Sequence, residues 1–298
     1  MKRTYDIFSF GHISLDVIKT LDSRKEMLGG AILHAAWAAH QLGFKNAVLT
    51  KSAPADKARL GEFPPMAKDD IYWVGSKVTT SILNDYKDKT LERRDCSSQG
   101  QADAYKKEDF PDFSAKVVQY AALMHGEVDL PLIKWLTKKG KLVVDAAGFI
   151  RKVMPDKTMQ SQQWPDLKAA FPHFDYFKAD AAESSFLTGL DCETHEGRVK
   201  AAEQFLQWGA KEIILTHNQE LLAANKDGNW AAPFKNRNLT GRTGRGDNAT
   251  TSYVLARLGS KPPEAVRFAA ALTSLKMETP GPFKGTRADV DAYMKQFY

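Results

Sequence analysis

Seven residues near the carboxyl end, Gly241–Asp247, combine three glycines, two arginines and a carboxylate. The stretch that follows has apolar residues on two sides, which predicts a buried helix over about 247–258. Free N–H groups at the start of a helix bind anions, and glycines let a phosphate approach the backbone closely. A carboxylate at such a site is explained if Asp247 removes a proton from a hydroxyl that attacks the bound phosphate. The alternative is a glycine turn in which Asp247 and Asn248 only cap the helix.

Strand-like and helix-like segments alternate along most of the chain, which predicts an α/β fold with a mainly parallel sheet covered by helices. Two stretches break this alternation: 71–95 is polar and β-rich and is expected to form a hairpin, and 97–113 is expected to be a loop. Strands are expected at 5–11, 46–53, 117–126, 142–148, 174–180 and 212–218, and a second hairpin at 221–234. Helices are expected at 29–44, 130–140, 181–187, 198–209, 247–258, 263–277 and 286–297.

The composition is that of an ordinary soluble globular protein, with 43% hydrophobic and 26% charged residues in 298. The formal net charge of +6 comes without a dense Lys/Arg block. This disfavours a nucleic-acid partner and suits a small ligand that carries phosphate. Two cysteines without a CxxC motif fit a reducing compartment. There is no signal peptide and no apolar run of about 20 residues, so a cytoplasmic protein without a membrane segment is expected.

The order of these features resembles the ribokinase-type (PfkB) carbohydrate kinase family over essentially the whole chain. The stretch 241–247 is similar to that family's Asp-Thr-x-Gly-Ala-Gly-Asp signature. The resemblance implies a ribokinase-like three-layer fold in a single domain, 1–298, with a β lid inserted at about 71–95. It also implies transfer of the γ-phosphate of ATP, with Mg²⁺, to a hydroxyl. Asp247 would be the general base, and the backbone of Gly244, Arg245 and Gly246 would be the anion hole.

Other stretches carry the same resemblance: "GHISLD" and "GGAILH" near the amino end, "VVDAAGFIR", and "KADAAE", which is similar to the family's Asn-x-x-Glu element. Taken alone, these residues also suit strand ends, helix starts and a packed histidine. The resemblance assigns acceptor binding to Asp16, Gly29, Gly30, His34 and Asn84. It assigns nucleotide contacts to Asp180, Thr216, Arg242 and Thr243. It assigns Mg²⁺ to Glu183, through water, and to Asp145, with Arg151 as a further polar candidate.

The chain departs from the family pattern at four places, one of which is "SAPADKARLGEF" (52–63), where the family's usual Gly-x-Asp-x-x-Gly pattern is missing. Gly241 stands where the signature has its first Asp, a residue linked to the monovalent-cation site of many relatives. Arg245 replaces the usual Ala and could reach the phosphates or point to solvent. The stretch "THNQELL" after Thr216 lacks the glycines that let ATP lie close.

The acceptor is less well defined than the reaction. "TTSILNDY", "GRTG" and "ETPGPFKGT" resemble a branch that includes inositol kinases, which suggests a polyol or cyclic sugar. A nucleoside is the alternative, with Tyr86 or Trp73 as its aromatic partner. A catalytically inactive sugar- or nucleotide-binding sensor is a third hypothesis. In many relatives the lid pairs with another subunit, so the resemblance also raises a homodimer. No G-x-G-x-x-G follows the first strand, which argues against an NAD enzyme.

Overall fold

A computed structural model describes residues 2–87 and 94–298 of the chain. Its main sheet has nine strands in the order β15-β14-β13-β12-β9-β8-β1-β4-β5. All neighbours in this sheet are parallel except β13, β14 and β15, which form an antiparallel end. The strands are β1 (Arg3–Phe10), β4 (Asn46–Ser52), β5 (Ile71–Gly75), β8 (Phe113–Tyr120), β9 (Lys141–Asp145), β12 (Tyr176–Asp180), β13 (Glu212–Thr216), β14 (Glu220–Asn225) and β15 (Gly228–Pro233).

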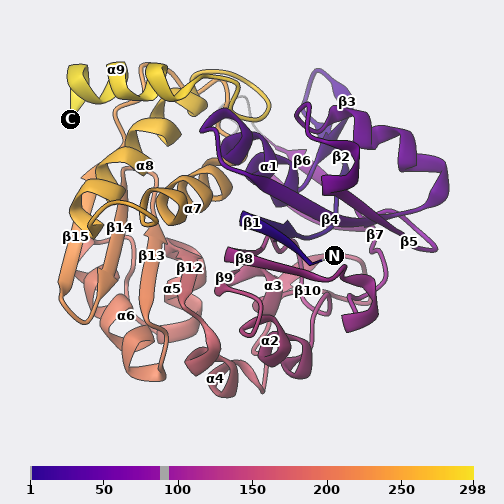
Figure 1. Ribbon diagram of the computed structural model, residues 1–298, viewed down its shortest axis with the longest axis horizontal. Coiled ribbons are helices and arrows are strands. Elements are labelled where there is room, and N and C mark those ends of the chain that lie inside the picture. Colours follow the sequence, from indigo (N-terminus) through magenta and orange to yellow (C-terminus); the bar gives the residue numbers. More distant parts are fainter. Residues whose placement is uncertain (1, 88–93) are drawn as a thin grey trace.

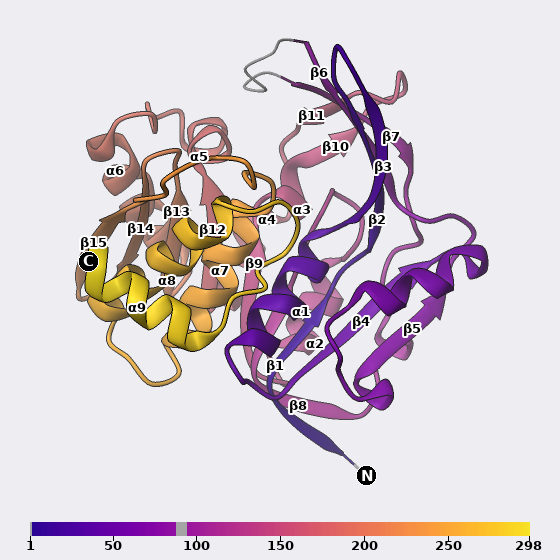
Figure 2. The same ribbon diagram turned by 90° about the horizontal axis from the view of Figure 1, so that it is seen from above.

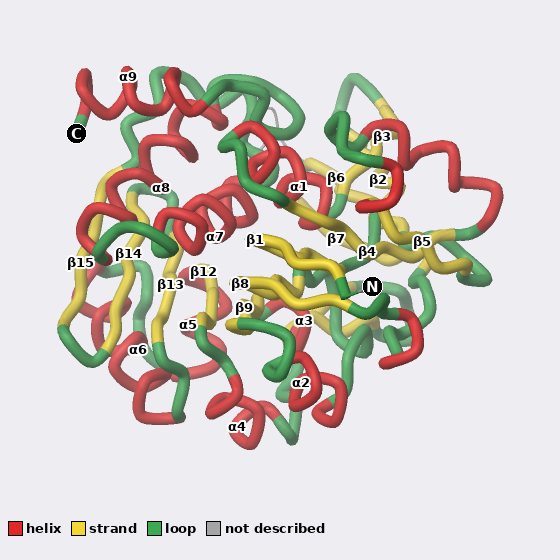
Figure 3. Tube along the Cα trace, in the orientation of Figure 1, coloured by secondary structure: helices red, strands yellow, loops and turns green. Residues whose placement is uncertain are grey.

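Helices cover both faces of this sheet, so the molecule has three layers (Figures 1 and 3). Two apolar cores, one on each side of the sheet, are built mainly from strand residues and the inner helix faces. The predicted α/β fold with a mainly parallel sheet is therefore confirmed. One face carries α1 (Ala31–Gln41), α7 (Arg245–Ala256), α8 (Pro262–Met277) and α9 (Arg287–Phe297). The other carries α2 (Leu130–Leu136), α3 (Ala147–Ile150), α4 (Leu167–Ala170), α5 (Ala181–Thr188) and α6 (His195–Trp208).

A second, four-stranded sheet in the order β3-β2-β6-β7 projects beyond the three layers (Figure 2). We call this sheet the lid. It consists of β2 (Ser14–Lys19), β3 (Arg24–Gly29), β6 (Ser81–Tyr86) and β7 (Arg94–Gly100).

The bounds predicted for the lid, 71–95, need correction in two ways. Residues 71–75 form β5, which pairs with β4 in the main sheet because Tyr72 and Val74 pack against its core. The lid also takes in 14–29, whose polar strands gave no strand pattern in the sequence. Residues 88–93 of the predicted hairpin lie outside the described residues.

A short antiparallel ribbon, β10 (Arg151–Val153) with β11 (Met159–Ser161), lies beside β7 of the lid (Figure 2). Ser97 forms a β-bridge with Thr158, and the Ser98 amide donates to the Lys157 carbonyl at 2.8 Å. The ribbon thus joins the lid to the body of the molecule.

The remaining elements are short 3-10 helices in the connections: η1 (Pro54–Glu62), η2 (Lys68–Asp70), η3 (Lys107–Asp109) and η4 (Phe171–His173). The predicted loop 97–113 is wrong at its start, because β7 continues to Gly100. Cys96 and Cys192 are both free thiols. Among the described residues, no helix has the length and apolar character to cross a bilayer. Pairing of two copies through the lid stays a prediction.

Candidate active site

The carboxyl ends of three parallel strands, β9, β12 and β13, bring polar residues to one edge of the main sheet. Lys178 is the register partner of Asp145, and Asp180 is the register partner of Thr216. Partners in register place their side chains on the same face of a sheet. The carboxyl edge of a parallel sheet is where α/β proteins bind ligands. The three strands therefore gather predicted site residues that lie far apart in the sequence.

Helix α7 begins above this edge, and its first turn carries Asp247. The N-cap is Gly244, with φ of 81°, a conformation that favours glycine. The helix starts at Arg245, so the prediction that Asp247 and Asn248 cap it is wrong. No side chain caps this helix. Its first N–H groups therefore stay available for an anion, as the anion-hole hypothesis requires.

Neighbouring side chains exclude a Cβ at Gly244 and leave little room for one at Gly246. A Cβ on Gly244 would lie 2.3 Å from Cε1 of His34, and a Cβ on Gly246 would lie 3.3 Å from the Lys178 ammonium. The side chain of Asn248 donates to the Gly244 carbonyl at 2.7 Å and contacts Nδ1 of His34 at 3.3 Å. Burial lowers the pKa of His34 to about 3, aided by the charge of Lys276, so the ring is neutral. His34 therefore packs under the loop and fixes its path.

The electrostatic surroundings of Asp247 suit a general base. Its withdrawal from water raises its pKa to about 6, and the nearby carboxylate of Asp145 acts in the same direction. The positive charges of Lys178, Arg151 and Lys276 oppose this rise. A base is most effective when its pKa lies near the working pH. Asp247 is thus ionised at neutral pH but accepts a proton more readily than an ordinary aspartate.

Lys178 is a buried ammonium between two carboxylates. Its Nζ lies 2.9 Å from Oδ2 of Asp145 and 3.5 Å from Oε2 of Glu183. Burial alone would lower the pKa of Lys178, but the charges of Asp145, Glu183 and Asp180 outweigh it and raise the pKa well above its usual value. Lys178 therefore carries a fixed positive charge next to Gly246.

Glu183 and Asp180 form the start of α5. The Asp180 side chain accepts from the Glu183 amide, and the Glu183 side chain accepts from the Asp180 amide, both at 2.8 Å. Burial raises the pKa of Glu183 to about 7, and Lys178 opposes that rise. Nη2 of Arg151 lies 3.5 Å from the second Glu183 oxygen. Both residues thus mark a helix start, the alternative given for them above, and their predicted roles toward Mg²⁺ and the nucleotide stay predictions.

The turn between β13 and β14 lies beside the start of α7 and the residues before it, and contacts them through Asn218. Oδ1 of Asn218 accepts from Arg245 at 2.8 Å and from Arg242 at 3.4 Å. Both arginines that depart from the family signature therefore converge on one amide oxygen. Thr216 is buried at the end of β13, whereas the Thr243 side chain is exposed.

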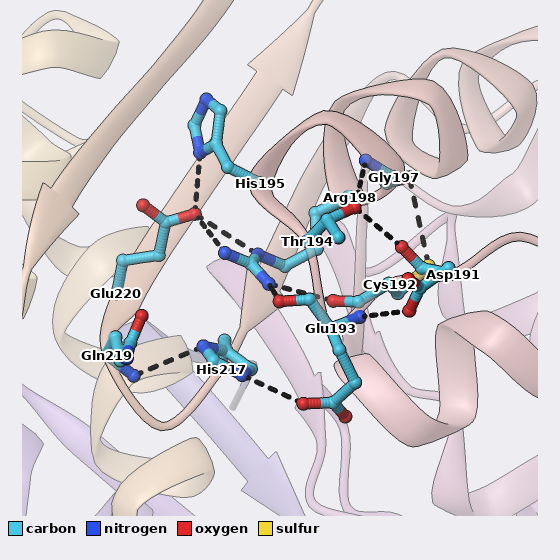
Figure 4. A network of polar contacts seen from close by, with 10 residues as sticks. All are labelled: Asp191, Cys192, Glu193, Thr194, His195, Gly197, Arg198, His217, Gln219 and Glu220. Carbon is cyan, nitrogen blue, oxygen red and sulfur yellow. Dashed lines mark hydrogen bonds and ion pairs between the residues drawn. The ribbon is translucent and has the colours of Figure 1, made fainter.

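A polar network joins this turn to α6 and to the loop before α6 (Figure 4). His217 contacts Glu193 at 3.1 Å, and the buried Arg198 donates to Glu220 at 2.7 Å. Arg198 also donates to two carbonyls of the loop before α6, and His195 contacts the same Glu220 oxygen at 2.7 Å. The network holds the short turn against α6, so Asn218 has a fixed backbone from which to orient the arginines.

On the lid side, polar atoms gather at the Gly29–Gly30 turn that precedes α1. A Cβ on Gly29 would lie 2.4 Å from the Asp16 carboxylate and 3.0 Å from the Ser14 hydroxyl oxygen. Gly30 has φ of 104° and packs against the His12 carbonyl. The two glycines leave room for Asp16 and Ser14 beside the start of α1.

Asn84 lies on the same face of the lid as Asp16, because its register partner is Ile18, two residues after Asp16. Its Oδ1 accepts from the Cys96 thiol at 3.5 Å. Trp73, in contrast, lies on β5 in the main sheet, where its indole donates to Ser52 at 2.9 Å. The structure therefore brings Asp16, Gly29, Gly30 and Asn84 together at the lid and leaves Trp73 out of it.

The sequence profile of the family described as "pfkB family carbohydrate kinase" matches residues 76–287. The chain belongs to this family. The match covers the lid strands β6 and β7 and the whole phosphate side of the site. Among curated sequences no match was found.

Solved structures of carbohydrate kinases resemble the chain over nearly its whole length. A pyrophosphate-dependent kinase in the ribokinase family, complexed with a pyrophosphate analog and myo-inositol, is 29% identical with a TM-score of 0.84, covering 96% of this chain and 99% of that one. A sulfate complex of a pyrophosphate-dependent kinase of the ribokinase family is 30% identical with a TM-score of 0.85 and the same coverage. Arabidopsis thaliana ribokinase, complexed with ribose and ATP, is 16% identical with a TM-score of 0.73, covering 99% of both chains, and shares the fold.

Several residues of this carbohydrate kinase site were not predicted from the sequence. Nothing in the local sequence around Lys178 or Lys276 marks a buried ammonium. Within residues 2–87 and 94–298, the buried hydroxyl of Ser14 has no hydrogen-bond partner, and neither does Oδ1 of Asn248. Asn218 could have been suspected, since it lies two residues after Thr216 in the stretch "THNQELL", which was already noted as a departure from the family pattern.

Proposed function

We propose that this carbohydrate kinase transfers a phosphoryl group to a hydroxyl of a cyclic polyol of the inositol type, with Asp247 as general base. The observation that carries the proposal is the place of Asp247 in the first turn of α7. Its carboxylate lies in the first turn of a helix that no described side chain caps, and the charges of Asp145 and Lys178 are close enough to shift its pKa. Kinases about 29% identical to the chain that bind or phosphorylate myo-inositol support this acceptor class.

In the proposed reaction, Asp247 accepts the proton of the attacking hydroxyl while that oxygen forms a bond to phosphorus. The bond between this phosphorus and the oxygen of the donor's leaving group breaks, and its electron pair leaves with the departing phosphate. The amides of Gly244, Arg245 and Gly246 face the oxygens of the transferring group, and Lys178 adds positive charge there. Because phosphoryl transfer depends on positioning and charge stabilisation, these groups supply what the reaction needs.

The acceptor lies, in this proposal, against the Gly29–Gly30 turn. The Asp16 carboxylate accepts hydrogen bonds from its ring hydroxyls, and the buried Ser14 hydroxyl donates to or accepts from one of them. Asn84 on the lid and His34 under the loop border the same space. A buried polar atom without a partner costs free energy, so a hydroxyl-rich ligand would stabilise Ser14.

Two phosphoryl donors fit the phosphate side. ATP is the donor that the family resemblance implies, with contacts from Asp180, Thr216, Arg242 and Thr243. Pyrophosphate is favoured by one observation: Asn218 draws Arg242 and Arg245 to the turn where the glycines of an ATP site are missing. Two guanidinium groups suit a compact polyanion. The pyrophosphate dependence of the related kinases supports the same choice.

The carboxylates of this side suit Mg²⁺ brought by the donor. Oxygen ligands are those that Mg²⁺ prefers, and it commonly keeps several waters. Asp145 and Glu183 each form an ion pair with Lys178 through one carboxylate oxygen. In this proposal, the two carboxylates accept hydrogen bonds from water molecules bound to Mg²⁺. Mg²⁺ bound there supplies charge neutralisation of the phosphates.

The test is a matrix of donors and acceptors. Purified protein with Mg²⁺ is incubated with pyrophosphate or ATP and with polyols, sugars or nucleosides, and phosphate monoesters are detected by ³¹P NMR. Formation of a polyol phosphate and orthophosphate from pyrophosphate supports the proposal. Turnover with ATP and not with pyrophosphate would show that ATP is the donor. Turnover with nucleosides and not with polyols would contradict the proposed acceptor class. Tight acceptor binding without turnover from either donor would make the chain a sensor.

A further inference from the structure

The last turn of α8 carries a buried ammonium, Lys276, which contacts residues 241–246, the loop that leads into the first turn of α7. We call these residues the phosphate loop. The side chain of Lys276 is 1% exposed. The ammonium donates to the Gly241 carbonyl at 2.5 Å and to the Thr243 carbonyl. Among the described residues no carboxylate forms an ion pair with it, so peptide oxygens are its hydrogen-bond partners there.

The backbone at Gly241 packs directly against the carboxyl end of α8. The Gly241 amide donates to the Met277 carbonyl at 2.7 Å, and a Cβ on Gly241 would lie 1.7 Å from the Thr279 carbonyl oxygen. An aspartate at this position would collide with the backbone of α8. Because glycine has no side chain, the backbone at Gly241 can lie this close to the end of α8. Its carbonyl then reaches the Lys276 ammonium.

Peptide carbonyls arranged around one positive charge form a cation site. Carbonyl oxygens bind hard cations, and an ammonium offers three donors in a compact group. The carboxyl end of a helix such as α8 also favours positive charge. In this chain the cation is covalently part of the protein.

The position of this charge relates it to the phosphate loop. The Thr243 carbonyl that it binds directly precedes Gly244, the N-cap of α7. Its charge also acts on both neighbours of the loop: it lowers the pKa of His34 and counters the rise in the pKa of Asp247. An ammonium held at this point fixes the chain just before the anion hole.

We infer that Lys276 is a built-in monovalent cation, which holds the Gly241 and Thr243 carbonyls and so positions the Gly244–Gly246 amides for the transferring phosphoryl group. The inference rests on the proposed function and adds a property to it: turnover does not need potassium or ammonium ions from solution. Lys276 is a positioning residue, since it touches the loop and not the substrates.

Three proteins test the inference: the wild type, K276A, which leaves space for an ion, and K276M, which fills the space without charge. Each is assayed with tetramethylammonium as the sole monovalent cation and then with K⁺, NH₄⁺ or Rb⁺ added. The wild type is expected to vary by less than about twofold. Both variants should lose about 10²–10³-fold in kcat, the range seen when one group that stabilises the transition state is removed. Added K⁺ or NH₄⁺ should restore K276A by about tenfold or more and leave K276M unchanged.

A second measurement does not depend on turnover. Crystals of K276A grown with Rb⁺ should show an anomalous peak between the Gly241 and Thr243 carbonyls, and wild-type crystals should show none there. A wild type that requires added K⁺, or a K276A that neither binds Rb⁺ nor responds to any ion, overturns the inference. If no donor and acceptor pair turns over, the proposed function fails. The Rb⁺ peak, and calorimetric pyrophosphate binding by K276A with and without K⁺, then decide this inference separately.

Discussion

On the phosphate side of the site, the ammonium groups of Lys178 and Lys276 are buried and bound by carboxylates or peptide carbonyls. On the lid, Lys19 and Lys87 are 49% and 54% exposed and share Asp85 at 3.1 and 2.8 Å. A buried charge keeps its full influence on its neighbours, whereas an exposed ion pair is screened by water. The phosphate side is thus built to hold charge in fixed positions. The lid offers hydrogen-bonding groups on a small sheet, and Leu28 and Ile82 pack its base against α1 and β4.

This difference predicts that changes at the buried charged residues of the phosphate side act on the rate or on stability, while changes on the lid act on acceptor binding. The largest effect is expected from Asp247→Asn. Loss of the base should lower kcat by about 10²–10⁴-fold. Stability should not fall, because the folded state raises the pKa of Asp247 and an ionised carboxylate there costs folding free energy at neutral pH.

Steady-state kinetics and a thermal unfolding curve check this prediction. The matched control is Asp227→Asn in the exposed turn between β14 and β15, which should leave both measurements unchanged. Turnover of Asp247→Asn equal to that of the wild type would remove Asp247 from its role.

Lys178→Met should give the largest loss of stability. It leaves Asp145 and Glu183 buried without their shared cation, which costs about 3–5 kcal/mol in comparable buried pairs. Urea unfolding measures the change in the free energy of unfolding. Lys211→Met, which removes an ammonium that is 67% exposed beside Asp175, should cost less than about 1 kcal/mol. Equal losses in the two variants would erase the distinction between buried and exposed charges.

The pH dependence of kcat/KM should be bell-shaped. Activity should rise with pH through about 6, as Asp247 loses its proton. It should fall through about 8, because burial lowers the pKa of Lys276 to about 8 and the neutral amine no longer serves as a cation. The rate should change about tenfold per pH unit on each limb. In K276A restored by K⁺ the alkaline limb should disappear, and its persistence would assign that limb to another group.

The smallest effects are expected where each substrate is only bound. Asn218→Ala removes the acceptor that orients Arg242 and Arg245, and should raise the KM of the donor by about tenfold or less. Asp16→Asn should raise the KM of the acceptor by a similar factor and leave the donor KM unchanged. Asn229→Ala and Asp22→Asn, both exposed, are the controls. Initial rates measured with each substrate varied in turn separate the two effects. If Asn218→Ala changed the KM of the acceptor and Asp16→Asn that of the donor, the assignment of the two binding sites would be reversed.

The core fold and the phosphate loop could be predicted from the sequence because their signals are local. Buried strands are short apolar runs, and the glycines of 241–246 stand directly before a helix. The lid strands 14–19 and 24–29 could not be predicted, since they are partly exposed and their polar residues hide the alternation of a strand. Lys276 meets the Gly241 carbonyl across 35 positions of the chain, and such a pairing leaves no trace in either local stretch.

The ribbon of β10 and β11 has a mechanical consequence. Its one end is bonded to β7 of the lid, at Ser97 and Ser98, and its other end is Arg151, whose guanidinium lies 3.5 Å from Glu183 beside the phosphates. A rotation of the lid that preserves these hydrogen bonds must carry the ribbon with it. Under the proposed function, an acceptor that rotated the lid would also shift Arg151 and Glu183 through this backbone connection, so binding of one substrate should change the affinity for the other.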